Sequence, residues 1–318
     1  MTNYAKLSQK PQQFHALTGS TLQEFHALLP AFETSFLEHM RHFTLDGQPR
    51  QKRTFTSYCN SPLPTPEDKL VFILMYLRKA ATQDLFGQVF DMAQPVVNKW
   101  VHRLHPCLNQ ALAALGERPA RTAEELALTE TEAQVFFQDG TERDIQRPKD
   151  KEQQKTFYSG KQKRHTVKNN LVVNEQAKVT LLTATCEGKK HDKKVSDEAG
   201  FTLPEGSLLY QDTGFQGFAL EGVTICQPKK KPRGHDLTPE EKEANRQLAQ
   251  IRIRVEHAIG GVKRYRIVKD LLRNWKKGFR DLVMETCCGL HNFRLNFRPW
   301  KYALHSSKVP EGPVAAPA

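Results

Sequence analysis

The sequence lacks the features of three protein classes. It has 6 cysteines in 318 residues and no C-x-x-C pair, which excludes a disulfide-rich scaffold and argues against the usual zinc motifs. The longest apolar run, residues 70–77, is far shorter than the roughly 20 residues that cross a bilayer. The polar N-terminus is not typical of a secretory signal. We therefore expect an intracellular protein with reduced thiols and no membrane partner.

Positive charge is abundant and unevenly distributed. The chain has 47 Lys and Arg against 35 Asp and Glu, a formal net charge of +12. Residues 1–130 hold 13 against 12, whereas residues 131–300 hold 32 against 22. Such a concentrated positive field favours a polyanionic partner, and nucleic acid is the first to consider. A solvated basic surface without a partner explains any single cluster equally well.

Apolar spacing predicts helices in the first part of the chain. Helices are expected over 21–43, over 65–77, where Thr65 and Pro66 form a start signal, and over 82–90 and 94–104. The last two, separated by the short segment 91–93, have the pattern of a helix-turn-helix. A plain three-helix packing module is nearly as well supported. In a helix-turn-helix, the second helix would present four side chains to a DNA groove: Gln94, Asn98, Lys99 and Arg103.

The pattern changes to short strands after residue 130. Strands are predicted over 133–138, 168–174, 178–185, 207–211 and 222–226, with helices over 191–199, 215–220 and 239–262. Thr238 to Glu241 form a capping box with proline at the first helical position. This order predicts an α/β domain with a mixed sheet. The expected domains are 1–130 (helical), 131–300 (α/β) and a flexible tail, 301–318.

Three acidic residues fall where this architecture would form a site. Asp139 and Asp212 end predicted strands, and sites in α/β sheets form beyond strand ends. Glu256 lies in the long helix, on one face with Arg252, Gly260 and Lys263. Converged carboxylates repel one another and need a cation, and oxygen ligands suit Mg²⁺ or Mn²⁺. Each acid taken alone is more simply a strand-end or surface carboxylate.

Five segments in a fixed order make the sequence recognisable. Residues 139–142, 158–166, 191–194, 212–217 and 254–264 closely resemble the DDE-superfamily transposases of bacterial insertion sequences, over about residues 65 to 297. The resemblance implies an N-terminal helix-turn-helix before an RNase H-like endonuclease domain, so the predicted fold is an RNase H-like mixed sheet with flanking helices, preceded by an all-α domain. It also implies that Asp139, Asp212 and Glu256 are the catalytic, metal-holding triad.

The resemblance further implies roles for neighbouring residues. Arg252 and Lys263 match a basic signature around the glutamate that contacts DNA, although Ala249 stands where a tyrosine often occurs. His191 and Asp192 match a family segment without a clear role. Asp192 could support the metal ligands from behind or cap the helix that follows, and we favour the cap. The other cations that we assign to DNA binding are Lys161, Lys163, Arg164, Lys229, Lys230, Lys231 and Arg264.

The expected function is that of a transposase in the bacterial cytoplasm. It would bind the terminal inverted repeats of its element as a dimer, nick DNA with the help of two Mg²⁺ or Mn²⁺ ions, and join the freed 3′ end to target DNA. Two alternatives are a domesticated nuclease that cuts without joining and a catalytically silent DNA-binding regulator. Cys287, Cys288 and His291 could suggest zinc, but an apolar packing helix explains them better.

Overall fold

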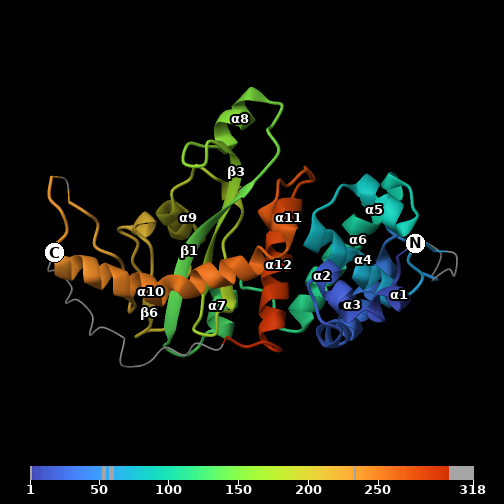
Figure 1. Ribbon diagram of the computed structural model, residues 1–318, viewed down its shortest axis with the longest axis horizontal. Coiled ribbons are helices and arrows are strands. Elements are labelled where there is room, and N and C mark those ends of the chain that lie inside the picture. The colour runs from blue at the N-terminus through green and yellow to red at the C-terminus, as the bar shows by residue number, and fades with distance from the viewer. Residues whose placement is uncertain (1, 52–54, 57–60, 233, 301–318) are drawn as a thin grey trace. The chain divides into compact units, whose positions relative to one another are not determined.

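The computed structural model describes residues 2–51, 55–56, 61–232 and 234–300 (Figure 1). These residues form two compact units. A helical unit comprises residues 1–118 and 262–297, and a sheet unit comprises residues 119–261 and the segment that begins at Arg298. The predicted flexible tail, 301–318, lies outside the described residues. In the described ranges no helix is both long enough and apolar enough to cross a membrane.

The helical unit contains the helices that apolar spacing predicted. Thr65 accepts a hydrogen bond from the N–H of Asp68 at 3.1 Å, which caps α4 as its sequence suggests. The sixth helix continues ten residues past its predicted end, because Leu108, Ala111 and Leu112 keep an apolar face buried beyond Pro106. The helices of the first 118 residues are α1 (Tyr4–Ser8), α2 (Pro11–Thr18), α3 (Leu22–His42), α4 (Pro66–Lys79), α5 (Gln83–Phe90) and α6 (Gln94–Ala114).

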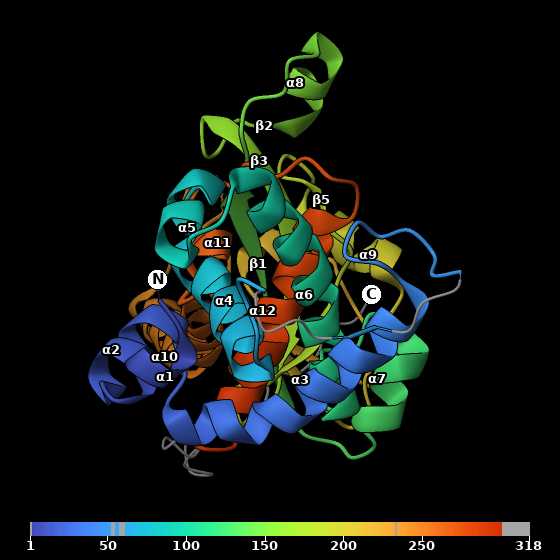
Figure 2. The ribbon, with the colours of Figure 1, turned by 90° about the vertical axis from the view of Figure 1, so that its right-hand side faces the viewer.

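Two later helices complete the helical unit. α11 (Arg266–Lys269) packs against α4, and α12 (Phe279–Leu295) packs against α6, as the views in Figures 1 and 2 show. Cys287, Cys288 and His291 are buried in α12, which agrees with their interpretation as packing residues. The helical unit therefore combines residues from both predicted domains, and the boundary at residue 130 stays a prediction.

The sheet unit is built on a mixed sheet with the strand order β2-β3-β1-β6-β7, in which β4 and β5 also pair with β3. β1 is antiparallel to β3 and parallel to β6, and β6 is parallel to β7. The predicted α/β fold with a mixed sheet and flanking helices is confirmed. The strands are β1 (Val135–Asp144), β2 (Tyr158–Ser159), β3 (Arg164–Val173), β4 (Val179–Leu182), β5 (Cys186–Glu187), β6 (Leu208–Tyr210) and β7 (Thr224–Cys226).

Helices lie on the two faces of this sheet. The helices of the unit are α7 (Ala123–Thr129), α8 (Lys151–Phe157), α9 (Asp192–Ala199) and α10 (Pro239–Val262). α10 crosses β1 in Figure 1, and its Arg254 guanidinium lies 5.6 Å from the centroid of the Phe137 ring. Phe136 points the other way, into the apolar core with Leu209 and Phe215. Figures 1 and 2 place α8 at the far end of the long β1–β3 ribbon.

In the sheet unit, β1 and one predicted helix differ from the prediction. β1 was expected to end at residue 138, but it runs to Asp144 because β3 remains paired with it as far as Asp144. A helix was expected over 215–220, but the structure has only the short 3-10 turn η1 (Thr213–Phe215). The long helix was predicted correctly, and its capping box forms: Thr238 N–H donates to Glu241 at 2.9 Å, and Glu241 N–H donates back to the Thr238 hydroxyl at 3.2 Å.

Candidate active site

Two of the three predicted acids lie at matching positions of neighbouring parallel segments: Asp139 is within β1, and Asp212 follows the end of β6 and begins the turn η1. Phe137 on β1 is paired with Tyr210 on β6, so Asp139 and Asp212 each follow that pair by two residues. The two rings stack with their centroids 5.6 Å apart. Because side chains alternate along a strand, Asp139 shares the face of Phe137, which is the face that α10 covers. The sequence predicted that Asp139 follows the end of its strand. The structure instead places it inside β1, which continues to Asp144.

The Asp139 carboxyl is largely buried, and this burial disfavours its charged form. Burial raises its pKa to about 6, and the charges of Asp212 and Asp192 act in the same direction. Two contacts oppose this rise: the Gly140 N–H donates to Asp139 Oδ1 at 2.8 Å, and Arg252 supplies positive charge. The hydrogen bond and the arginine together do not offset the effect of burial, so the pKa of Asp139 stays above its ordinary value.

Asp212 is half-buried and responds in the opposite sense. Burial alone would raise its pKa, but hydrogen bonds from the Thr213 hydroxyl at 2.9 Å and the Gly214 N–H at 3.2 Å, together with Arg252, lower it below the ordinary value. Asp212 also caps the turn η1. The two aspartates thus have separated pKa values, as is common at sites that handle charge.

Arg252 on α10 is the cation that both aspartates feel. Its positive charge acts to lower the pKa of both Asp139 and Asp212. Within the described part of the chain, no group accepts a hydrogen bond from its buried Nε atom. Arg252 therefore keeps donor capacity for a further anion.

Glu256 and Lys263 are not brought into this group. Glu256 is exposed on α10, one helical turn after Arg252 and on the same side of the helix. Lys263 follows the last residue of α10, so it does not continue the helical face that its spacing suggested. Across the described ranges, no three His, Cys, Asp or Glu side chains are grouped closely enough to hold a metal ion. The three-carboxylate ligand set stays a prediction.

Most of the remaining basic residues assigned to DNA lie in loops or at a strand end of the sheet unit. Arg264 belongs to the helical unit. Arg164 pairs with Asp144 at 2.6 Å, Lys231 with Asp236 at 2.5 Å, and Lys229 with Glu241. Such exposed pairs are worth about 0–1 kcal/mol, so a phosphate can replace the acid at little cost. The others are exposed in the sheet unit (Lys161, Lys163 and Lys230) or belong to the helical unit (Arg264, beside His15).

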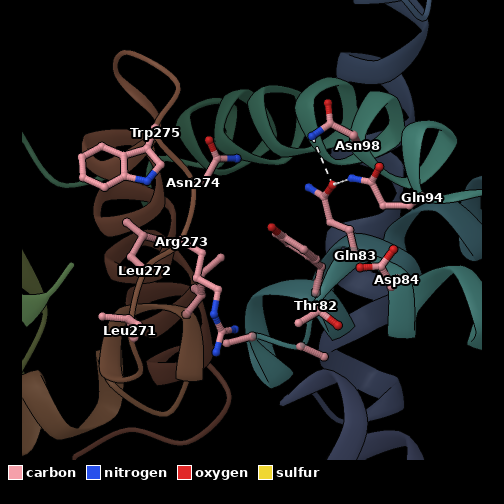
Figure 3. A pocket seen from close by; sticks show the side chains of 14 residues that line it. Thr82, Gln83, Asp84, Gln94, Asn98, Leu271, Leu272, Arg273, Asn274 and Trp275 are labelled. Atoms are coloured by element: carbon pink, nitrogen blue, oxygen red, sulfur yellow. Dashed lines mark hydrogen bonds between the residues drawn. The ribbon is translucent and has the colours of Figure 1, made fainter. Parts of the chain in front are cut away.

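The predicted recognition residues of α6 divide into two groups. Gln94 and Asn98 both donate to Oε1 of Gln83 on α5, at 2.5 and 3.2 Å (Figure 3). They line a cleft of about 360 Å³ whose opposite wall includes Trp275. Sequence reasoning missed Gln83, although its place at the start of the first helix of the motif was visible.

Lys99 and Arg103 lie on another side of α6. Lys99 pairs with Asp46 at 2.5 Å, and Arg103 donates toward the Leu45 carbonyl at 3.4 Å and contacts His39 at 2.9 Å. Positions five apart on a helix differ by about 140° in direction. The four residues therefore do not present one common surface, and Gln94 and Asn98 are the pair that shares a partner.

Asp192 does not cap α9, contrary to our interpretation of the sequence. The N-cap residue is His191, which makes no side-chain cap, and Asp192 is the first helical residue. Its carboxylate instead pairs with Lys168 at 3.0 Å and contributes to the raised pKa of Asp139. The helical position explains the error, because acids also favour the first turn without capping.

Two parts of the chain match known protein families. Residues 138–292 match a family model described as DDE superfamily endonuclease, and residues 61–114 match the helix-turn-helix of DDE superfamily endonuclease. The probable transposase for insertion sequence element IS702 from Microchaete diplosiphon is 28% identical over 231 residues, which cover 72% of this chain and 80% of the relative. No solved structure matches the chain. Asp139, Asp212 and Glu256 all fall within the matched range 138–292.

Proposed function

Because the chain belongs to the DDE superfamily of endonucleases, we propose that it is a DNA transposase of the bacterial cytoplasm that nicks DNA at element ends and joins the freed 3′ end to target DNA. The observation that carries this proposal is the matched placement of Asp139 in β1 and of Asp212 just after β6, the parallel neighbour of β1, with the charge of Arg252 acting on both. Membership in the superfamily implies dependence on a divalent metal ion.

The donor chemistry of the two aspartates fits such an ion, and Glu256, which lies outside their group, would complete the predicted ligand set. Asp139, Asp212 and Glu256 would hold Mg²⁺ or Mn²⁺, two ions in all, because hard cations prefer carboxylate oxygens. A bound ion would activate a water or a DNA 3′-hydroxyl and stabilise the leaving oxygen. Burial, aided by the charges of Asp212 and Asp192, raises the pKa of Asp139, and a bound cation would stabilise its charged form.

The chain's own residues prepare the site before DNA arrives. Arg252 offsets part of the charge of the two aspartates and keeps its buried Nε available as a donor to a phosphate. Exposed cations on the turns of the sheet unit add sequence-independent attraction for the backbone. These groups bind and orient DNA, and the sequence of the element ends must be read elsewhere.

The start of α6 suits that reading. Gln83 accepts from both Gln94 and Asn98, which fixes the rotamers of the two amides and leaves the carbonyl oxygen of each as an acceptor. Gln and Asn pair in a bidentate manner with adenine in the major groove. Gln94 is exposed at the first position of the helix, where recognition helices contact bases. We assign base reading to Gln94, held in place by Gln83.

The catalytic proposal is tested with DNA that carries the terminal inverted repeats flanking the gene. Wild-type protein with Mg²⁺ should nick this DNA and transfer the strand, whereas Asp212→Asn should bind the DNA but not nick it. Asp197→Asn is the control, because Asp197 is an exposed acid of the same unit that pairs with Lys193 at 2.6 Å. Nicking without joining would indicate a domesticated nuclease. Binding without nicking by the wild type would indicate a regulator and contradict the proposal.

End binding is tested separately by fluorescence anisotropy. Gln83→Ala should reduce the preference for the element end over a site with a substituted adenine by about tenfold, since one good bidentate contact is worth about 1–3 kcal/mol. Gln88→Ala, an exposed glutamine on the same helix, should leave this preference unchanged. We also propose that two copies act together at paired element ends, and sedimentation of the DNA complex should then show a dimer.

A further inference from the structure

A buried polar layer separates β1 and β3 from α9. Gln138 donates to the Ser196 hydroxyl at 2.6 Å and accepts from Gln211 at 2.8 Å. Asn170 donates to the Ser196 hydroxyl at 2.9 Å and to the Asp192 carbonyl at 2.7 Å. This layer lies on the face of β1 opposite the Asp139 side chain, because positions 138, 140 and 142 alternate with 139. The backbone that carries Asp139 therefore rests on hydrogen-bonded polar groups.

Lys168 brings a buried charge into this layer and Asp192 balances it. The Lys168 side chain is only 9% exposed, and its Nζ lies 3.0 Å from Asp192 Oδ1, 3.7 Å from Glu142 Oε1 and 2.9 Å from the Lys190 carbonyl oxygen. A buried ammonium left without a partner is strongly unfavourable, so the lysine keeps the Asp192 carboxylate in place.

Two glycines of the site motifs leave room for that carboxylate. A Cβ on Gly140 would lie 2.5 Å from Asp192 Oδ1, and a Cβ on Gly214 would lie 3.0 Å from Asp192 Oδ2. Gly140 directly follows Asp139, and the Gly214 N–H donates to Asp212. The Asp192 carboxylate thus packs against the backbone beside both site aspartates, from the face away from α10.

We infer that Asp192 is a positioning residue of the metal centre: its carboxylate, held by Lys168, packs between Gly140 and Gly214 and sets the spacing of Asp139 and Asp212. This inference rests on the proposed function. Two carboxylates that must share a cation repel each other without it, so their backbone has to resist separation. Groups that orient metal ligands in this way change metal affinity by about 10–100-fold when they are removed.

The first experiment measures Mn²⁺ binding by isothermal titration calorimetry on the full chain without DNA. Asp192→Ala should weaken Mn²⁺ binding by about tenfold or more. Asp197→Ala makes the same substitution five residues further along α9. It should leave the Mn²⁺ affinity within about twofold, because the Asp197 pair with Lys193 is exposed. Equal affinities of wild type and Asp192→Ala would overturn the inference and leave the proposed function standing.

The second experiment tests whether Asp192 acts through the glycines. Gly214→Ala alone should weaken Mn²⁺ binding, because the new Cβ meets the Asp192 carboxylate. In the Asp192→Ala background the same change should have no further effect, since the three atoms nearest to that Cβ all belong to the Asp192 side chain and its one close contact is with the carboxylate. Gly160→Ala, which meets nothing within 4 Å, is the matched control. Losses that multiply in the double variant would contradict the inference.

The remaining outcomes also decide the matter. A wild-type protein that binds no Mn²⁺ would overturn the proposed function and this inference with it. If Asp192→Ala does not fold, as circular dichroism would show, Lys168→Met releases the same carboxylate and should weaken Mn²⁺ binding as well. Unchanged affinity in a folded Lys168→Met variant would overturn the inference.

Discussion

The two faces of strand β1 differ in how their polar groups are satisfied. On the face toward α10, Asp139 has one backbone hydrogen bond, a neighbouring carboxylate and an arginine with a buried Nε that has no acceptor among the described residues. On the face toward α9, Gln138 is fully buried and bonded at both ends of its amide. The α10 face retains a carboxylate with unbalanced charge. The buried charges of the α9 face are paired, although Asn170 Oδ1 and Asp192 Oδ1 there accept no hydrogen bond from the described residues. The contrast indicates that the strand carrying the candidate site is fixed by hydrogen bonds on the face opposite Asp139.

The largest expected effect comes from removing a charge on the α10 face. Asp139→Asn should lower the rate of metal-dependent DNA nicking by about 10³-fold or more, equivalent to about 4 kcal/mol of transition-state stabilisation. Single-turnover cleavage of end-bearing DNA measures this loss. Substitution of Gln153 by leucine, on an exposed helix of the same unit, should not change the rate. Full activity of Asp139→Asn would mean that the reactive face lies elsewhere.

The same substitution should stabilise the metal-free protein. The pKa of Asp139 is raised from 3.8 to about 6, so the folded state binds more protons than the unfolded state between about pH 4 and pH 6, and stability falls as pH rises through that window. Above about pH 6 the penalty is constant, at most about 3 kcal/mol. Asp139→Asn should match wild type at pH 4 and exceed it at pH 7 in urea unfolding with chelator. A difference that does not change with pH would refute this origin.

A substitution on the α9 face should have the opposite sign. Gln138→Leu leaves Gln211 without its buried acceptor and removes a donor to Ser196, which should cost about 2 kcal/mol of the free energy of unfolding. Urea unfolding at pH 7 gives the value, and Gln153→Leu is again the control. If Gln138→Leu were neutral, the polar layer would not be the support that we describe.

The smallest effect is expected for Asp197, an exposed residue of α9, the helix that packs against the polar layer. Asp197→Asn breaks an exposed pair with Lys193 and should change the free energy of unfolding by less than about 0.5 kcal/mol. Chemical unfolding measures this as well. A loss as large as that of Gln138→Leu would contradict the expectation that buried polar contacts of β1 stabilise the protein more than the exposed ion pair on α9.

Local signals in the sequence predicted much of the fold. Thr65 and Thr238 cap their helices as expected, because a cap and its partner lie within three residues of each other. The mixed sheet followed from the order of short apolar strands. The extent of β1 did not, since its second half is a strand only through its pairing with β3. The helix expected over 215–220 failed for the related reason that Phe215 and Phe218 serve the core of the sheet unit.

The candidate site shows the same division. The sequence determined which acids and cations the chain contains, their order, and the resemblance that singled out Asp139, Asp212 and Glu256. Tertiary structure decided that Asp139 and Asp212 occupy matching positions, through a register that pairs Phe137 with Tyr210, and that Asp192 supports the backbone where a cap was expected. It also decided that Gln83 holds Gln94 and Asn98. Local patterns act within one or two helical turns, whereas register and facing are set by contacts between segments far apart in the chain.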